Sequence, residues 1–415
     1  MNRIRTTLEY ILVLMIILEF NTPYLVFPFV KHIMQYAPIL ILTCLIFMSG
    51  EIIKIRSIKY LLVYFLGAVI PFLVLSKGYF AYLRIYIIML PLMWTYLNLR
   101  KYRGITAYHS LFLRYSNIVI VLAVVSLIMW MLCSLLGIIP LTMQIPSYWT
   151  QGGYLRFIST YWGIYFETQH FSLFSIEAWR NTGIFNEGPM YNMILCTSLA
   201  IECFIRLKKS TVRIVILVLA IITTVTTTGQ FLLIMLLFWT FIKKISRKQQ
   251  KLLILFFPVL FYCTYIGINV LMEEKLESEK GSSSVDTRSD SIGKCLEVGF
   301  EHPVLGVGLM SGKVRIRSLV LDEHSNSLFE LFAYGGLYVV TLYIGGLLIL
   351  PFLYYIKYKD LQWLLTMGSF FIIFSVTLSQ YRYLTLLFLA WGLSSIDMVE
   401  CGAIHNKSKS WTHEH

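Results

Sequence analysis

The sequence predicts an all-α integral membrane protein with about twelve transmembrane helices and two long extracytoplasmic loops. Of its 415 residues, 57% are hydrophobic and only 14% are charged, whereas a soluble domain carries about a quarter charged residues. Apolar runs of about 17–25 residues recur along the whole chain, and each is long enough to cross a bilayer as a helix. Since no polar stretch is large enough to bury a separate core, residues 1–415 are predicted to form a single polytopic membrane domain.

Basic residues between the apolar runs predict how the chain is oriented. The predicted spans begin near Leu8, Ile33, Tyr60, Tyr79, Tyr115, Pro189, Val212, Gln230, Leu252, Ser327, Gln362 and Tyr383. Cytoplasmic loops carry an excess of Lys and Arg, so Arg3 and Arg5 place the N-terminus inside. Every even-numbered span up to the tenth then ends inside, and each ends in a basic cluster, at Lys54, Arg100, Arg206, Lys243 and Lys357. Lys407 and Lys409 place the C-terminus on the same side.

The charge distribution and the cysteines argue against nucleic-acid binding, a disulfide framework and a metal site. The net charge of +13 is divided into short clusters between apolar runs, which is the pattern of membrane topology and not of nucleic-acid binding. Most of the seven Cys lie in apolar runs, so neither an extracytoplasmic disulfide framework nor a metal site is expected.

Two connections are unusually long, at 140–188 and 273–323, and both are predicted to lie outside the cytoplasm. Long connections tend to be functional or disordered. The first is rich in aromatic residues such as Tyr148, Trp149 and Trp162, which favours a helix lying on the membrane interface, with stacking on sugars as the alternative. Between them, residues 212–242 are short for two spans, and two short helices meeting at the polar turn 226–230 are predicted.

Polar residues with candidate chemistry lie at the edges of these loops. Arg180 and Glu187 precede the predicted helix start at Gly188-Pro189. Arg180 can hold lipid headgroups or grip a diphosphate in bidentate fashion, and Glu187 can face the helix dipole or orient a ligand. Arg288 lies between two acids, for which a surface salt bridge is the plain interpretation.

The second long loop ends in a further polar group. His324 lies among acids just before the tenth span, where a structural role and a general base are both open. Ser327 and Glu330 match a capping box. Arg84, inside the fourth predicted span, either marks function or extends to the outer surface, and Arg382 lies at the outer end of the eleventh.

These pieces, in this order, resemble the O-antigen ligase and polysaccharide polymerase (Wzy-type) family. The matching positions are Arg180, Gly183, Phe185 and Glu187 before a span, Thr228-Gly229-Gln230 at a turn, Arg288, then Pro303, Gly306 and Gly308, and finally His324 and Gly335. The resemblance covers roughly residues 180–336. Two positions depart from the family pattern: Gln230 stands where Ser-Arg is usual, and Asn326 follows His324 by two residues instead of one.

The resemblance implies a GT-C-like multi-helical fold and a glycosyltransferase of the bacterial cytoplasmic (inner) membrane that assembles a surface polysaccharide such as O-antigen or capsule. Donor and acceptor would be undecaprenyl-pyrophosphate-linked oligosaccharides in the outer leaflet. Arg180 and Arg288 would neutralise the leaving pyrophosphate, His324 would accept the proton of the acceptor hydroxyl, and Glu187 would position it.

Additional site residues would come from Arg315, Arg317, Arg382, Asn326 and Gln230, since the turn lacks its usual cation. No cofactor and no metal is expected. The lipid bilayer is one partner, a chain-length regulator and a flippase are others, and no nucleic acid is expected.

Two other functions fit parts of the pattern. A ligase that transfers finished glycan to another acceptor would share every motif. A lipid-linked sugar flippase or transporter would instead place charges within several spans, and here Arg84 is the exception among nearly uncharged spans.

Overall fold

The computed structural model describes residues 2–50, 55–74, 79–151, 154–173, 176–242, 292–308 and 327–396. By their contacts these residues form two compact units. Unit 1 comprises Met1–Phe20, Lys31–Tyr115 and Ile292–His415, and unit 2 comprises Asn21–Val30 and Ser116–Ser291. The chain thus divides near the start of one helix, α7 (Ser110–Met129). Each unit is described by itself below.

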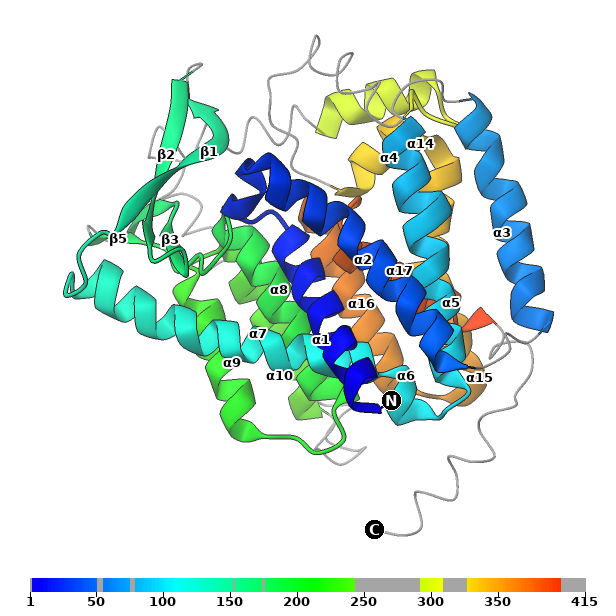
Figure 1. Ribbon diagram of the computed structural model, residues 1–415, viewed down its shortest axis with the longest axis horizontal. Coiled ribbons are helices and arrows are strands. Elements are labelled where there is room, and N and C mark those ends of the chain that lie inside the picture. Colours follow the sequence, from blue (N-terminus) through cyan, green and yellow to red (C-terminus); the bar gives the residue numbers. More distant parts are fainter. Residues whose placement is uncertain are drawn as a thin grey trace. The chain divides into compact units, whose positions relative to one another are not determined.

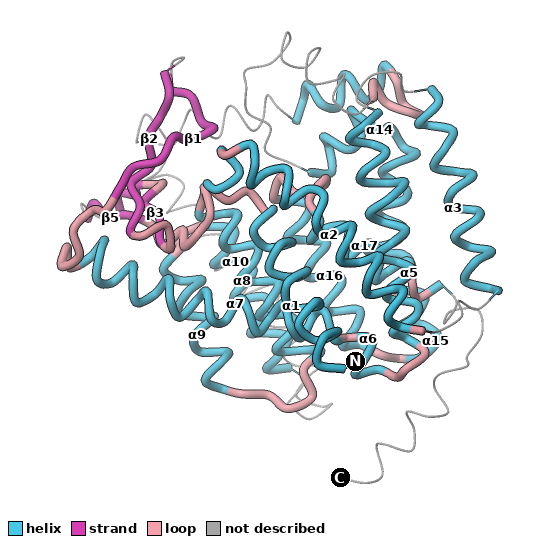
Figure 2. Tube along the Cα trace, in the orientation of Figure 1, coloured by secondary structure: helices cyan, strands magenta, loops and turns pink. Residues whose placement is uncertain are grey.

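Unit 1 is built from helices throughout its described part, as the tube view shows (Figure 2). They are α1 (Asn2–Glu19), α2 (Pro28–Ser49), α3 (Ile55–Val74), α4 (Tyr79–Tyr82), the π-helix η2 (Leu83–Met89), α5 (Leu90–Lys101), α6 (Ile105–Tyr108), a helix at 292–301, α14 (Ser327–Ile344), the π-helix η5 (Gly345–Ile349), α15 (Leu350–Tyr358), α16 (Leu361–Val376) and α17 (Tyr383–Leu393).

Unit 2 combines helices with strands, which lie at one end of its helices (Figure 1). Its elements are the 3-10 helix η1 (Pro23–Val26), α7 with the π-helix η3 (Trp130–Leu135), β1 (Met143–Gln151), β2 (Tyr154–Tyr161), β3 (Tyr165–Glu167), β4 (His170–Leu173), β5 (Ile176–Trp179), α8 (Gly188–Ala200) with the π-helix η4 (Ile201–Ile205), α9 (Thr211–Thr223) and α10 (Thr227–Ile242).

The helices lie where the hydropathy pattern places spans, except near Leu252, which is outside the described residues. Four stretches are long and apolar enough to cross a membrane: Pro28–Ser49, Ser110–Leu135, Gly188–Ile205 and Ser327–Tyr358. The chain is therefore a mostly helical membrane protein. Several other apolar helices, among them Thr211–Thr223, Leu361–Val376 and Tyr383–Leu393, are shorter, so the predicted number of crossings remains a prediction.

The first long loop differs from its prediction. Instead of a helix on the membrane interface, residues 143–167 form an antiparallel sheet in the order β1-β2-β3, and β4 pairs with β5 in a hairpin. In the first pairing Ile145 stands opposite Ile158, and both side chains are buried. Aromatic and β-branched residues favour strands because they pack on cross-strand neighbours. The expectation of an all-α protein is therefore wrong for this segment.

The prediction of two short helices in residues 212–242 is confirmed by α9 and α10, but the connection lies at 224–226, and residues 227–230 of the predicted turn form the start of α10. Their connection is tight, because Val225 adopts a left-handed backbone conformation with φ of 47°, which is strained for a β-branched residue. The Gln230 side-chain amide donates to the carbonyls of Ile221 and Ile222, both at 3.4 Å. It therefore satisfies acceptors left open at the end of α9.

Contacts between helix ends agree with the charge pattern. In unit 1, Lys101 Nζ donates to the carbonyl of Ser394 at 2.8 Å, joining two ends that are both predicted to be cytoplasmic. Ser379 N donates to Ser327 Oγ at 2.7 Å, joining two ends that are both predicted to be outside. Each contact therefore joins helix ends that the charge pattern puts on one side of the membrane.

Candidate functional site

The segment 180–187, which connects β5 to α8, runs antiparallel to residues 166–169. Arg180 N donates to the carbonyl of Gln169 at 3.0 Å, and Phe166 N donates to the carbonyl of Gly183 at 3.1 Å. The first bond continues the register of the β4-β5 hairpin, in which His170 pairs with Trp179. Residues directly opposite in such a pair point to the same face, so Arg180 and Gln169 share one face.

A neutral hydrogen-bond network holds this segment. Asn181 is fully buried, and its amide donates to Thr223 Oγ1 at 3.0 Å and to Ser126 Oγ at 3.3 Å. Its side-chain carbonyl accepts from Gly183 N at 3.2 Å. Gly183 has a φ of 55°, and a Cβ there would lie 3.1 Å from the ring of Tyr191, so only glycine fits. The motif glycine is thus explained by the turn that it makes.

The same face leads to the N-terminus of α8. Glu187 is the N-cap residue, and Gln169 Oε1 accepts a hydrogen bond from Gly188 N at 3.0 Å. Pro189 occupies the first turn, so the predicted helix start is confirmed. A Cβ on Gly188 would lie 3.1 Å from Thr226 Cγ2. Two motifs that the sequence separates by some forty residues, at 180–189 and 226–230, therefore meet at this helix end.

Arg180 is the charged residue in this neutral setting. Its Nε is enclosed and has no hydrogen-bond partner among the described residues, and its guanidinium forms no ion pair with any of them. Burial lowers the pKa of Arg180, yet an arginine remains charged at any physiological pH. The N-terminus of α8, which carries partial positive charge, lies on the same face of the strand pairing, because Gln169 on that face accepts from Gly188 N. Both features favour an anion, and a phosphate is the type that arginine grips best.

The second motif region lies in unit 1. Residues 303–308 insert into a break in α14, where Gly336 leaves the helical conformation with φ of 58°. Leu337 N donates to the carbonyl of Pro303 at 2.8 Å on one side of the break, and Gly308 N donates to the carbonyl of Tyr334 at 2.9 Å on the other. The 303–308 segment therefore supplies the hydrogen bonds that the broken helix gives up.

Glycine is required on both sides of that contact. A Cβ on Gly336 would lie 2.4 Å from the carbonyl oxygen of Val304, and a Cβ on Gly306 would lie 2.4 Å from the backbone of Tyr334. Since no real Cβ approaches a backbone atom so closely, a side chain at either position would push the two segments apart. The Pro-x-x-Gly-x-Gly motif thus fixes the second long loop to α14.

The structure describes four of the predicted site residues. Glu187 is the N-cap residue of α8, Arg180 lies earlier in the segment that leads from β5 to this helix, Gln230 caps α9, and Arg382 pairs with Glu19 in unit 1. The other predicted residues, Arg288, Arg315, Arg317, His324 and Asn326, lie outside the described residues. Sequence reasoning assigned no role to Gln169, Asn181 or Thr223, which build the Arg180 corner. Asn181 adjoins Arg180 in the motif, which is the one signal that pointed to it.

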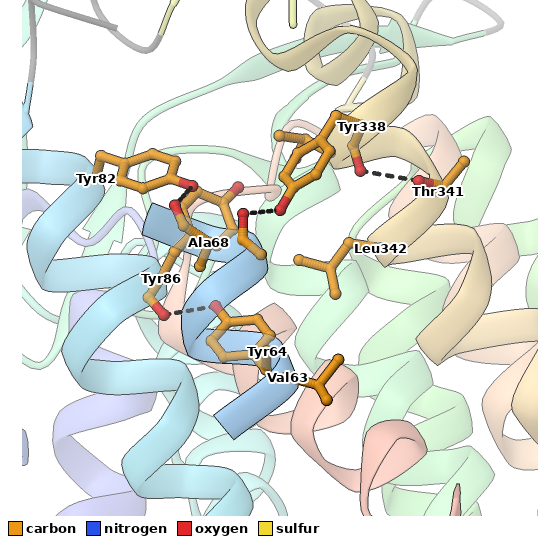
Figure 3. A pocket seen from close by; sticks show the side chains of 10 residues that line it. Val63, Tyr64, Ala68, Tyr82, Tyr86, Tyr338, Thr341 and Leu342 are labelled. Carbon is orange, nitrogen blue, oxygen red and sulfur yellow. Dashed lines mark hydrogen bonds between the residues drawn. The ribbon is translucent and has the colours of Figure 1, made fainter. Parts of the chain in front are cut away.

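Unit 1 also contains a cavity of about 290 Å³ between α3, η2 and α14 (Figure 3). Tyrosines dominate its wall, and their hydroxyls donate to backbone carbonyls: Tyr82 to Ala68 at 2.8 Å, Tyr64 to Tyr86 at 2.5 Å, and Tyr338 to Gly67.

Proline explains why two of these backbone carbonyls are free to accept a hydrogen bond from a tyrosine. Pro71 has no N–H for the carbonyl of Gly67 four residues earlier, and Pro91 has none for Tyr86, five residues earlier in the register of a π-helix. A tyrosine hydroxyl takes the place of each missing donor. The cavity wall therefore presents rings and hydrocarbon, and we do not place the chemistry there.

No protein-family model, no curated protein and no solved structure matches this chain. Among the described residues no group of three or more His, Cys, Asp or Glu is arranged to hold a metal ion. The function must therefore be argued from the site alone.

Proposed function

We propose that this protein is a membrane glycosyltransferase that joins oligosaccharide repeat units carried on undecaprenyl pyrophosphate into a surface polysaccharide. In the reaction, a hydroxyl oxygen of the acceptor glycan attacks the anomeric carbon of the donor. The bond between that carbon and the diphosphate oxygen breaks, and the hydroxyl proton passes to His324. The products are a longer lipid-linked glycan and free undecaprenyl pyrophosphate.

The observation that carries this proposal is the state of Arg180. A guanidinium that is withdrawn from water without a carboxylate partner is costly, and a fold tolerates such a cost where a ligand supplies the missing charge. As the diphosphate leaves, its negative charge grows, so a cation fixed beside a helix N-terminus stabilises the transition state more than the ground state. Glu187, at the same helix end, would orient the acceptor.

The contact between residues 303–308 and α14 supports the same proposal. It anchors the second long loop at two points on α14, whose first residue is Ser327. Arg288 and His324 belong to the chain on either side of these anchors. A site assembled from loops needs such fixed points, since a misplacement of about 1 Å can cost a hundredfold in rate.

A complementation experiment tests the proposal. A strain that lacks the gene receives wild-type protein, Arg180→Lys or Arg180→Gln at matched expression, and polymer length is read on a gel together with the pool of lipid-linked repeat units. We expect Arg180→Gln to lose about a hundredfold in polymerisation, and Arg180→Lys to lose part of it because lysine lacks the planar fork. Single repeat units should then accumulate on the outer face.

Arg156 provides a matched control, since this exposed arginine of the same outer segment donates to the carbonyl of Thr168 at 2.6 Å. Arg156→Gln should polymerise normally. Wild-type chain length in a well-expressed Arg180→Gln variant would contradict the proposal. Repeat units stranded on the inner face of the deletion strain would identify a flippase, and finished polymer that fails to reach its acceptor would identify a ligase.

A further inference from the structure

A second cluster of arginines lies in unit 1, around Glu19 at the end of α1. Arg382 Nη1 contacts Glu19 Oε1 at 3.2 Å and also donates to the backbone carbonyl of Glu19 at 3.1 Å. The other carboxylate oxygen, Oε2, accepts from Tyr383 N at 3.1 Å, at the start of α17. Both oxygens of Glu19 are thus engaged, and its single negative charge is matched by Arg382.

Arg84 adds a second cation that has no such match. It belongs to η2, and its side-chain Nε is enclosed without a hydrogen-bond partner among the described residues. Its element η2 packs on α17, whose first residue Tyr383 donates to Glu19, and the charge of Arg84 acts on both Glu19 and Tyr383. Among the described residues that these contacts name, two guanidinium groups then share the single carboxylate of Glu19, which matches one of their two charges.

Packing holds element η2, which carries Arg84, beside this corner. Element η2 packs directly on α17, and a chain of hydroxyls reaches from η2 to the segment before α17. Tyr86 Oη lies 3.2 Å from Tyr343 Oη, and Tyr343 in turn donates to the carbonyl of Gln380 at 2.5 Å. The Arg382 side chain remains 32% exposed, so a ligand from outside the protein can reach the corner.

Sidedness indicates which ligand. Glu19 ends the first predicted span, Arg84 lies near the start of the fourth, and Arg382 precedes the twelfth, so the charge pattern places all three near the outer face. An arginine pair at that depth fits the phosphate groups of a lipid. A reaction between two lipid-linked glycans needs places for two diphosphates, and Arg180 provides one of them in the proposed function.

We propose that Arg84 and Arg382 form a second anion site, which holds the diphosphate of the acceptor lipid while Arg180 serves the donor. The identity of this ligand rests on the proposed function. The existence of a second lipid-phosphate site does not, because it is argued from the two arginines and the one carboxylate that the described residues bring to this corner. The two arginine sites divide between the two units of the chain, one in each.

Binding stoichiometry tests the inference. Full-length protein in nanodiscs of neutral lipid is titrated with radiolabelled undecaprenyl pyrophosphate that carries no sugar. Wild-type protein should bind two equivalents. Arg84→Gln should weaken one class of site by about tenfold or more, the loss expected for a charge-assisted hydrogen bond, and Arg180→Gln should weaken the other. The double variant should lose both, while Lys31→Gln, which removes an exposed charge on α2, should bind like wild type.

The outcomes separate the two proposals. If the Arg84→Gln variant still binds two equivalents of undecaprenyl pyrophosphate with wild-type affinity, the second site is overturned, whatever the polymerisation assay shows. Loss of one equivalent in a protein that makes no polymer in any strain would uphold the site and refute the polymerase. In nanodiscs that contain phosphatidylglycerol, displacement of the Arg84-dependent equivalent by that lipid would overturn the assignment to a diphosphate. Arg382→Gln removes the partner of Glu19, so Arg84→Gln decides the matter if Arg382→Gln fails to fold.

Discussion

The two ends of the helix formed by α8 and its continuation η4 differ in how their arginines are partnered. At the C-terminal end, Glu202 is almost fully buried and contacts Arg206 Nε and Arg213 Nη2, each at 2.8 Å. Asn117 Oδ1 accepts from both arginines, at 2.8 and 2.7 Å, and Ser116 Oγ donates to Glu202 at 2.5 Å. The charges of Glu202, Arg206 and Arg213 therefore each have a partner of opposite sign.

At the N-terminal end the structural bonds are made by neutral groups. Asn181, Thr182 and Gln169 hold the entering chain through amides, hydroxyls and backbone groups. Arg180 takes part with its backbone N–H only. We call the C-terminal end, where the charges pair with one another, the closed end, and the N-terminal end the open end. Charge at the closed end is structural. The charge of Arg180 at the open end is not required by the fold, and we assign it to a ligand.

The largest effect on stability is expected at the closed end. Glu202→Gln leaves Arg206 and Arg213 without a carboxylate in a partly buried site, which should cost about 3 kcal/mol. Apparent melting temperature in detergent micelles measures this loss against Glu297→Gln, which removes an exposed carboxylate of the helix at 292–301. A Glu202→Gln protein as stable as this control would show that the closed network is not structural.

An intermediate effect is expected from the neutral network. Asn181→Ala removes three side-chain hydrogen bonds and leaves the N–H of Gly183 and the hydroxyl of Thr223 to find other partners, at a cost of about 1–3 kcal/mol. Gln144→Ala, at an exposed position of β1, is the control. Equal melting temperatures for the two variants would mean that other contacts hold the segment before α8.

The smallest effect on stability is expected at Arg180. Arg180→Gln removes a desolvated charge that has no described carboxylate partner, so the melting temperature should stay unchanged or rise, even where polymerisation is lost. A destabilisation as large as that of Glu202→Gln would remove the contrast between the two ends and make Arg180 a structural residue.

Much of the architecture was predictable from hydropathy and turn chemistry. Helices stand where the apolar runs predict them, and the polar turn near Val225 does separate two short helices. The strands at 143–179 were missed, because aromatic residues suit both a membrane interface and a pleated sheet. The sequence pattern there, with few charges and no helical stripe, does not separate the two.

The motif residues of the candidate site were predictable from the sequence. The residues that hold them in place through hydrogen bonds were not. Arg180, Gly183 and Glu187 stand together in the sequence, so a motif could reveal them. Gln169 reaches Gly188 from across a strand pairing, and Thr223 reaches Asn181 from the end of another helix. Such long-range partners leave no local pattern, because a glutamine in a loop or a threonine at a helix end has many ordinary uses.

The sequence by itself determined that the chain is a mostly helical membrane protein, since burial in lipid demands apolar length and forbids unpaired charge. It also determined where glycine and proline must bend the backbone. Only the tertiary structure decided which charged side chains form ion pairs within the protein. Whether Arg180, Arg84 or Arg382 meets a carboxylate depends on which helix end packs beside it, and that choice is made by contacts between residues far apart in the chain.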